Sequence, residues 1–167
     1  LRYRRHTVGF VWQQTGRNLL PYLTAAENVA LPMRLARGRR RRAARRRAAE
    51  LLELVAVGHC ADRRPAEMSG GEQQRTAVAV AVANDPQVLL ADEPTGELDE
   101  TTAGEVFGAL QMINKELGVT TVVVTHDAGV SERVPRVVAI RDGRTASETL
   151  RATRFDAAGA TAHVTEE

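Results

Sequence analysis

The sequence predicts an α/β fold, in which helices pack on a parallel β-sheet, because two apolar runs each end in polar side chains. Residues 87–91 lead directly into Asp92 and Glu93, and the β-branched residues 119–125 lead into His126. Buried parallel strands are almost continuously apolar, and open α/β sheets bind ligands beyond the carboxyl ends of their strands. We therefore expect Asp92, Glu93 and His126 at the ligand-binding edge of the sheet.

The composition limits the class of protein. The length of 167 residues suits one domain with a sizeable core. No stretch of about eighteen consecutive apolar residues is present, so we expect no direct insertion into a membrane. Cys60 is the only cysteine, so no internal disulfide can form. The formal net charge is +2, and Lys115 is the only lysine among many arginines.

Two helices are predicted between the first strand, at residues 7–12, and the middle of the chain. The first begins at a capping box, in which the side chains of Thr24 and Glu27 bond each other's backbone N–H groups. Pro32 should kink this helix or end it early. The second helix is predicted over residues 39–57 and should end at Gly58, because glycine commonly terminates helices.

The first half of the second helix is strongly basic. Such a run can mark contact with nucleic acid or with anionic lipid. A solvated helix face is the favoured interpretation, because the aromatic side chains on which single-stranded bases stack are absent. The run consists of Arg39, Arg40, Arg41, Arg42, Arg45, Arg46 and Arg47.

A third helix should begin at Ser69, which forms a capping box with Glu72. Its first-turn amides and the positive end of its dipole favour an anion, and Gly70 and Gly71 let that anion approach the backbone closely. From these residues alone, an ordinary capped helix is the alternative. The small apolar residues 76–83 are predicted to continue this helix.

The C-terminal third should contain a helix and a β-hairpin. The helix is predicted over residues 100–117. The hairpin should pair residues 137–140 with residues 145–147 around an Asp142-Gly143 turn, a dipeptide typical of two-residue hairpin loops.

These motifs together resemble the ATP-binding-cassette (ABC) ATPases, over roughly residues 7–148. The resemblance implies a P-loop NTPase core with an α-helical signature subdomain at about residues 24–84. Five motifs stand in the family's order: Gln13, the Ser-Gly-Gly-Glu-Gln stretch at 69–73, the Leu-Leu-Ala-Asp-Glu strand end at 89–93, Asp99 and His126.

The resemblance gives catalytic roles to individual residues and implies ATP and Mg²⁺ as cofactors. Gln13 would reach the Mg²⁺ and the attacking water, and Gln14 remains an outside candidate because the following spacer is about one residue longer than usual. Asp92 would belong to the metal shell as the family's Walker B aspartate. Glu93 would polarise the water, and His126 would contact the γ-phosphate.

A second group of residues is implied to act between subunits. Ser69, Gly70, Gly71 and Gln73 would contact ATP held by a partner subunit, and Asp99 belongs to the D-loop that crosses between the two subunits. A homodimer or a paired ATPase subunit is therefore expected.

One family element does not occur in these 167 residues. P-loop NTPases hold the β- and γ-phosphates with Gly-x-x-x-x-Gly-Lys-[Ser/Thr], and Lys115 lies far from any glycine loop. We expect an N-terminal truncation before Gln13, with natural loss of nucleotide binding as the alternative. Residues 1–150 would then be a partial ABC ATPase domain that does not hydrolyse ATP alone, and residues 151–167 a polar tail.

The favoured function is the ATP-binding subunit of an ABC transporter, which couples ATP hydrolysis to transport by a transmembrane permease. The alternatives are a soluble ABC-type ATPase acting on nucleic acid and a non-catalytic ABC module. The first is disfavoured because residues 14–68 hold two helices rather than a coiled coil or zinc module, so we expect no nucleic-acid partner. The motifs at residues 18–32 and 93–99 resemble the lipoprotein-releasing and macrolide-exporting group. Such a subunit would be cytoplasmic, peripheral on the inner face of the cell membrane, and residues 19–22 would contact the permease.

Overall fold

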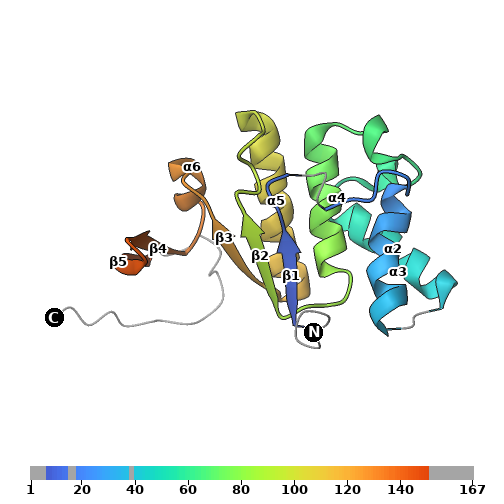
Figure 1. Ribbon diagram of the computed structural model, residues 1–167, viewed down its shortest axis with the longest axis horizontal. Coiled ribbons are helices and arrows are strands. Elements are labelled where there is room, and N and C mark those ends of the chain that lie inside the picture. The colour runs from blue at the N-terminus through green and yellow to red at the C-terminus, as the bar shows by residue number, and fades with distance from the viewer. Residues whose placement is uncertain (1–6, 15–17, 38–39, 151–167) are drawn as a thin grey trace. The chain divides into compact units, whose positions relative to one another are not determined.

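The computed structural model describes residues 7–14, 18–37 and 40–150. The chain divides after His126 into two compact units, each of which is described by itself. The first contains a parallel sheet and most of the helices, and the second contains a short helix and a hairpin (Figure 1).

The sheet confirms the predicted parallel α/β arrangement. Its strands are β1 (Val8–Val11), β2 (Val88–Asp92) and β3 (Thr120–Val124), in the order β1-β2-β3. Both pairings are parallel, so the three carboxyl ends lie at one edge. Helices α4 and α5 pack against β1 and β3, respectively.

The prediction that β3 is a buried strand was wrong. Alternate residues of β3 are exposed, with 45% of Val122 and 61% of Val124 accessible. The register places Val122 opposite Leu90. Both side chains lie on the face of the sheet opposite the one that holds the buried Leu89 and packs against the helices. An apolar run therefore indicated a strand, but it did not indicate whether both of its faces are covered in the described part of the chain.

The helical part between β1 and β2 follows the sequence closely, with two corrections. Its elements are α2 (Ala25–Arg37), α3 (Arg41–Leu54), the 3₁₀ turns η2 (Gly58–Cys60) and η3 (Pro65–Glu67), and α4 (Gly70–Val82). Helix α2 continues through Pro32, because the buried side chains of Val29 and Met33 anchor it on both sides. Helix α3 ends before Gly58, since Ala56 already adopts a left-handed backbone with φ 57°.

The packing of β1 on α4 depends on a glycine. A Cβ atom on Gly9 would lie 2.4 Å from the backbone carbonyl oxygen of Ala81, so only glycine permits this approach. Along the chain, α4 is followed by β2 and then by α5 (Glu100–Leu117). The two helices pack together. Gly118, with φ 65°, ends α5.

The second unit contains α6 (Ala128–Ser131), β4 (Arg136–Arg141) and β5 (Arg144–Leu150). The antiparallel hairpin confirms the prediction, and its turn residues Asp142 and Gly143 have φ values of 51° and 73°, as a type I′ turn requires. The predicted polar tail at residues 151–167 lies outside the described residues. No helix in the described ranges is long and apolar enough to cross a membrane.

Candidate functional site

The carboxyl edge of the sheet brings Glu93 and His126 together. Glu93 follows β2 directly, in a left-handed backbone conformation with φ 43°, and its N–H donates to the Val124 carbonyl. Its carboxylate accepts hydrogen bonds from the Thr125 hydroxyl at 3.0 Å and from the His126 N–H at 3.1 Å, and lies 2.7 Å from the imidazole Nδ1 of His126. The end of β3 therefore fixes the orientation of the Glu93 carboxylate.

The same contacts control the charge of Glu93. Burial alone would raise its pKa, but hydrogen bonds from His126 and Thr125 outweigh burial and lower the pKa below its ordinary value. An ionised carboxylate can accept a proton from a water molecule. His126 is 86% exposed at its side chain, so its ring is accessible to a ligand.

Gln13 and Glu93 both lie near Gly96. A Cβ atom built on Gly96 would lie 3.0 Å from the Gln13 side-chain nitrogen and 3.6 Å from Cβ of Glu93, so both residues flank Gly96. Asn18 closes the loop after β1 by bonding both the N–H and the carbonyl of Trp12. The role of Gln13 stays a prediction, and the spacer at residues 15–17 lies outside the described residues.

Asp92 is exposed at the last position of β2. Its carboxylate and the Gln13 side-chain oxygen are the hard oxygen donors that Mg²⁺ prefers, and Mg²⁺ commonly binds one or two carboxylates together with phosphates. The residues present therefore fit this metal. Asp92 and Gln13 would hold it.

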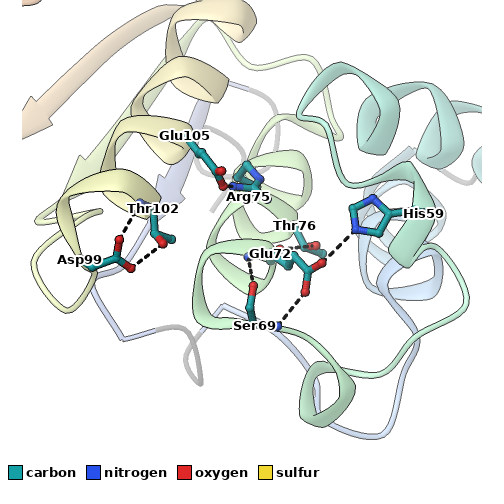
Figure 2. Close-up of polar contacts among 8 residues, drawn as sticks. All are labelled: His59, Ser69, Glu72, Arg75, Thr76, Asp99, Thr102 and Glu105. Atoms are coloured by element: carbon teal, nitrogen blue, oxygen red, sulfur yellow. Dashed lines mark hydrogen bonds and ion pairs between the residues drawn. The ribbon is translucent and has the colours of Figure 1, made fainter.

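The Ser69 motif forms the predicted helix start. The Ser69 Oγ accepts from the Glu72 N–H at 3.2 Å, and the Glu72 Oε2 accepts from the Ser69 N–H at 2.7 Å (Figure 2). Gln73 donates its side-chain amide to the Met68 carbonyl. Gly70 is exposed whereas Gly71 is buried, so the two glycines differ in role.

Gly71 makes room for α5. A Cβ atom on Gly71 would lie 2.2 Å from Cγ2 of Thr102. Thr102 cannot rotate freely, because its hydroxyl donates to the Asp99 carboxylate (Figure 2). The buried glycine therefore permits the contact between the first turns of α4 and α5.

We expect Gly71→Ala to lower the free energy of unfolding by about 1–3 kcal/mol, the usual cost of overpacking. Adding Thr102→Ser should restore most of the loss, because serine lacks Cγ2 but keeps the hydroxyl. Urea unfolding measures both effects. Gly70→Ala is the matched control, since its nearest neighbour would be Leu98 at 3.4 Å. Equal losses at both glycines would contradict the packing argument.

Glu72 carries the strongest electrostatic effect at this helix start. Hydrogen bonds from the Ser69 backbone and from His59 lower its pKa from an ordinary value of 4.5 to about 2. Its side chain is 17% exposed. A carboxylate with a lowered pKa stabilises the folded state above its unfolded pKa, and the contribution disappears as the pH falls through the folded pKa.

The stability difference between the wild type and Glu72→Gln should therefore depend on pH. We expect the full difference, up to about 3 kcal/mol, above pH 4.5 and its progressive loss toward pH 2. Urea unfolding of both proteins across this range measures it. A difference that stays constant with pH would show that Glu72 stabilises the fold without its charge.

Asp99 has a structural role that the sequence interpretation missed. It caps α5, because its carboxylate accepts from the Thr102 N–H at 3.1 Å and from the Thr102 hydroxyl at 2.5 Å. These bonds lower the pKa of Asp99. The sequence signal for this cap was available, because Asp99 directly precedes the helix predicted over residues 100–117 and aspartate is a preferred N-cap residue.

Two buried polar residues also escaped the sequence interpretation. The Gln74 side chain, 1% exposed, donates to the Trp12 carbonyl at 3.1 Å and so joins α4 to the end of β1 beside Gln13. Arg75, 8% exposed, pairs with Glu105 of α5 (Figure 2). Helix α4 is therefore tied by side chains to both the Gln13 loop and α5.

Comparison with known proteins agrees with this arrangement. The family model described as "ABC transporter" matches residues 1–96. The chain belongs to the ABC transporter family. This membership confirms the resemblance to the ABC ATPases.

Two curated relatives are similar to this chain over most of its length. The chain is 51% identical over 142 residues to the lipoprotein-releasing system ATP-binding protein LolD 2 of Caulobacter vibrioides, covering 85% of this chain and 61% of the relative. It is 47% identical over 147 residues to the macrolide export ATP-binding/permease protein MacB of Rhodopirellula baltica, covering 87% and 21%. The chain thus spans about three fifths of the length of the lipoprotein-releasing relative.

A solved structure supports the fold. The ATP-binding cassette MJ0796, described as a dimeric post-hydrolysis state bound to ADP and Pi, superposes with a TM-score of 0.76 at 41% identity. The match covers 91% of this chain and 66% of MJ0796. The parallel sheet with its helices is therefore an ABC ATPase core, as the sequence predicted.

Proposed function

We propose that this chain is part of the ATP-binding subunit of an ABC transporter, in which ATP hydrolysis drives transport by a separate transmembrane permease. The observation that carries the proposal is the Glu93 carboxylate, held ionised by Thr125 and His126 at the carboxyl edge of the sheet. Such a group suits a water-polarising base in phosphoanhydride hydrolysis. The relatives' names agree with a lipoprotein-releasing or macrolide-exporting system.

The other site residues fit around this base. Mg²⁺ bound at Asp92 and Gln13 would neutralise phosphate charge. His126 would contact the γ-phosphate, because its ring is exposed beside Glu93. The β- and γ-phosphates also need a Gly-rich loop with lysine, which these 167 residues do not contain.

An ATPase acting on nucleic acid is disfavoured. The described residues between Gln13 and Ser69 form α2, α3 and two 3₁₀ turns, with no coiled coil. The arginines of α3 that the structure describes are mostly exposed, and Arg46 and Arg47 pair with Glu50. This favours a solvated face. A non-catalytic module is also disfavoured, because the chain retains Glu93 and His126 and the two side chains contact each other.

The permease contact is proposed for the segment after Gln13. Leu19 is 5% exposed and belongs to the core, whereas Leu20 is 36% and Tyr22 is 66% exposed. Asn28 fixes this segment by bonding the N–H and carbonyl of Leu20. An exposed aromatic side chain on a rigid segment suits a protein interface on the inner face of a cell membrane.

We expect Tyr22→Asp in the whole protein to abolish co-purification with the permease while thermal stability stays within a few degrees of the wild type. Leu35→Asp is the matched control, because Leu35 is 74% exposed near the far end of α2 and should leave co-purification intact. Retained permease binding by Tyr22→Asp would move the interface elsewhere. Leu19→Asp should unfold the protein.

A further inference from the structure

A cluster of three different metal-ligating side chains lies next to the Ser69 motif and takes no part in the proposed ATPase chemistry. It consists of His59 and Cys60 on η2 and Glu72 on the first turn of α4. One ligand atom of each lies within 4.8 Å of the other two. The imidazole Nε2 of His59 is 2.9 Å from Oε1 of Glu72 (Figure 2).

We propose that His59, Cys60 and Glu72 form a binding site for a zinc-type divalent cation. Thiolate, imidazole and carboxylate are the three ligand types that zinc takes in proteins, and three protein ligands leave a fourth position for water. Zinc ligands in a tetrahedral site lie about 3–4 Å apart, so small side-chain rotations close the cluster around an ion. The soft thiolate distinguishes this site from the all-oxygen donors at Asp92 and Gln13, which suit Mg²⁺.

The surrounding contacts prepare Glu72 for this role. Its second oxygen, Oε2, is held by the Ser69 N–H at 2.7 Å, so Oε1 is directed toward His59. Hydrogen bonds from surrounding groups to a metal-binding side chain commonly fix its orientation. A bound ion would leave the capping box intact, since the cap uses the other oxygen.

Cys60 and His59 supply the remaining requirements. The Cys60 residue is fully buried, and its thiol hydrogen-bonds Glu72. The thiol supplies the proton of this hydrogen bond, because an ionised carboxylate only accepts. Binding of a divalent cation would release this proton and form the thiolate ligand. The His59 side chain is 57% exposed and gives the ion a path from solvent.

The site would clamp η2 to the start of α4. The loop between them, with η3, would then be closed at both ends, and the positions of Ser69 and Gly70 would depend on the ion. A metal at this point would therefore stabilise the helical part of the chain and fix the motif proposed to face a partner's nucleotide.

The test is a titration of the tag-free 167-residue chain with Zn²⁺ by calorimetry and with Co²⁺ by absorption. We expect one ion per chain, retained in excess Mg²⁺, and a thiolate-to-cobalt charge-transfer band. Cys60 is the only cysteine, so only it can produce that band. Cys60→Ser should abolish the band, and His59→Gln should weaken binding about tenfold or more.

A control variant makes the test specific. Glu67→Gln is the matched control, because Glu67 caps η3 through the Arg64 N–H and lies outside the cluster, so it should bind Zn²⁺ as the wild type does. Cys60 is buried, so its substitution also disturbs packing, and the exposed His59→Gln therefore decides the outcome independently. Binding unchanged in His59→Gln, binding lost in His126→Gln instead, or cobalt bound without the thiolate band would each overturn the proposal.

Discussion

Replacing Glu93 with glutamine in the whole protein is expected to lower ATP turnover by about a hundredfold or more while nucleotide binding is retained. The carboxamide has nearly the same shape as the carboxylate and can still bond the Thr125 hydroxyl and the His126 N–H. It carries no negative charge, however, and polarises a water molecule far less. Phosphate release measures turnover, and equilibrium titration with labelled ATP measures binding.

Glu97→Gln is the matched control for this result. Glu97 is an exposed carboxylate in the same loop, four residues beyond Glu93. It should turn over ATP at the wild-type rate. Turnover by Glu93→Gln close to the wild type would place the catalytic base elsewhere, whereas loss of ATP binding would show that Glu93 is needed to shape the pocket.

Much of the fold was predictable because local signals coincided with packing. The two capping boxes at Thr24 and Ser69 form as predicted, and each begins a helix with a buried apolar face. The Asp142-Gly143 turn has the positive φ values that favour this dipeptide. In these places a short stretch of sequence determines the backbone without help from distant residues.

The errors arose where contacts with residues distant in sequence determine where a helix ends or how far a strand is buried. Pro32 predicts a kink or an early end, and the early end was wrong, because packing on both sides of Pro32 holds α2 together. Gly58 predicts a helix end, yet the left-handed residue is Ala56. The exposure of β3 depends on what covers each face of the sheet. A local sequence pattern predicts none of these three outcomes.

The candidate site was predictable to a similar extent. Strand ends located Glu93 and His126, because parallel strands share an edge, and the two side chains do meet. Their mutual orientation, including the Thr125 hydrogen bond, could not be predicted, since it depends on the left-handed turn at Glu93. The hydrogen bond from the Gln74 side chain to the Trp12 carbonyl could not be predicted either, because the two residues are distant in sequence.

The difference between Gly70 and Gly71 determines how the proposed subunit arrangement is best tested. Gly71 packs against Thr102, so its variants disturb the fold itself. Gly70 is exposed, and a Cβ atom there meets only Leu98 at 3.4 Å. Gly70→Asp should therefore fold normally while it places a carboxylate against the phosphate of a bound nucleotide.

Two mixed dimers of the whole protein carry the same pair of lesions in different arrangements. The first joins a Glu93→Gln subunit to a Gly70→Asp subunit, and the second joins a doubly substituted subunit to a wild-type one. If Gly70 acts on the partner's ATP, the first dimer keeps one intact site, because both lesions fall in the other. The second dimer then has a lesion in each of its sites. The dimeric state of the relative MJ0796 supports this arrangement.

We therefore expect the first dimer to retain turnover and the second to lose it, by about a hundredfold relative to the first. Dimers isolated by two different affinity tags and assayed for phosphate release provide the comparison, and calorimetric melting of each subunit alone checks its folding. Because both dimers contain the same substitutions, destabilisation cannot produce the difference. The opposite ranking would show that Gly70 and Glu93 of one subunit serve the same nucleotide, and the proposed exchange of motifs between subunits would be wrong.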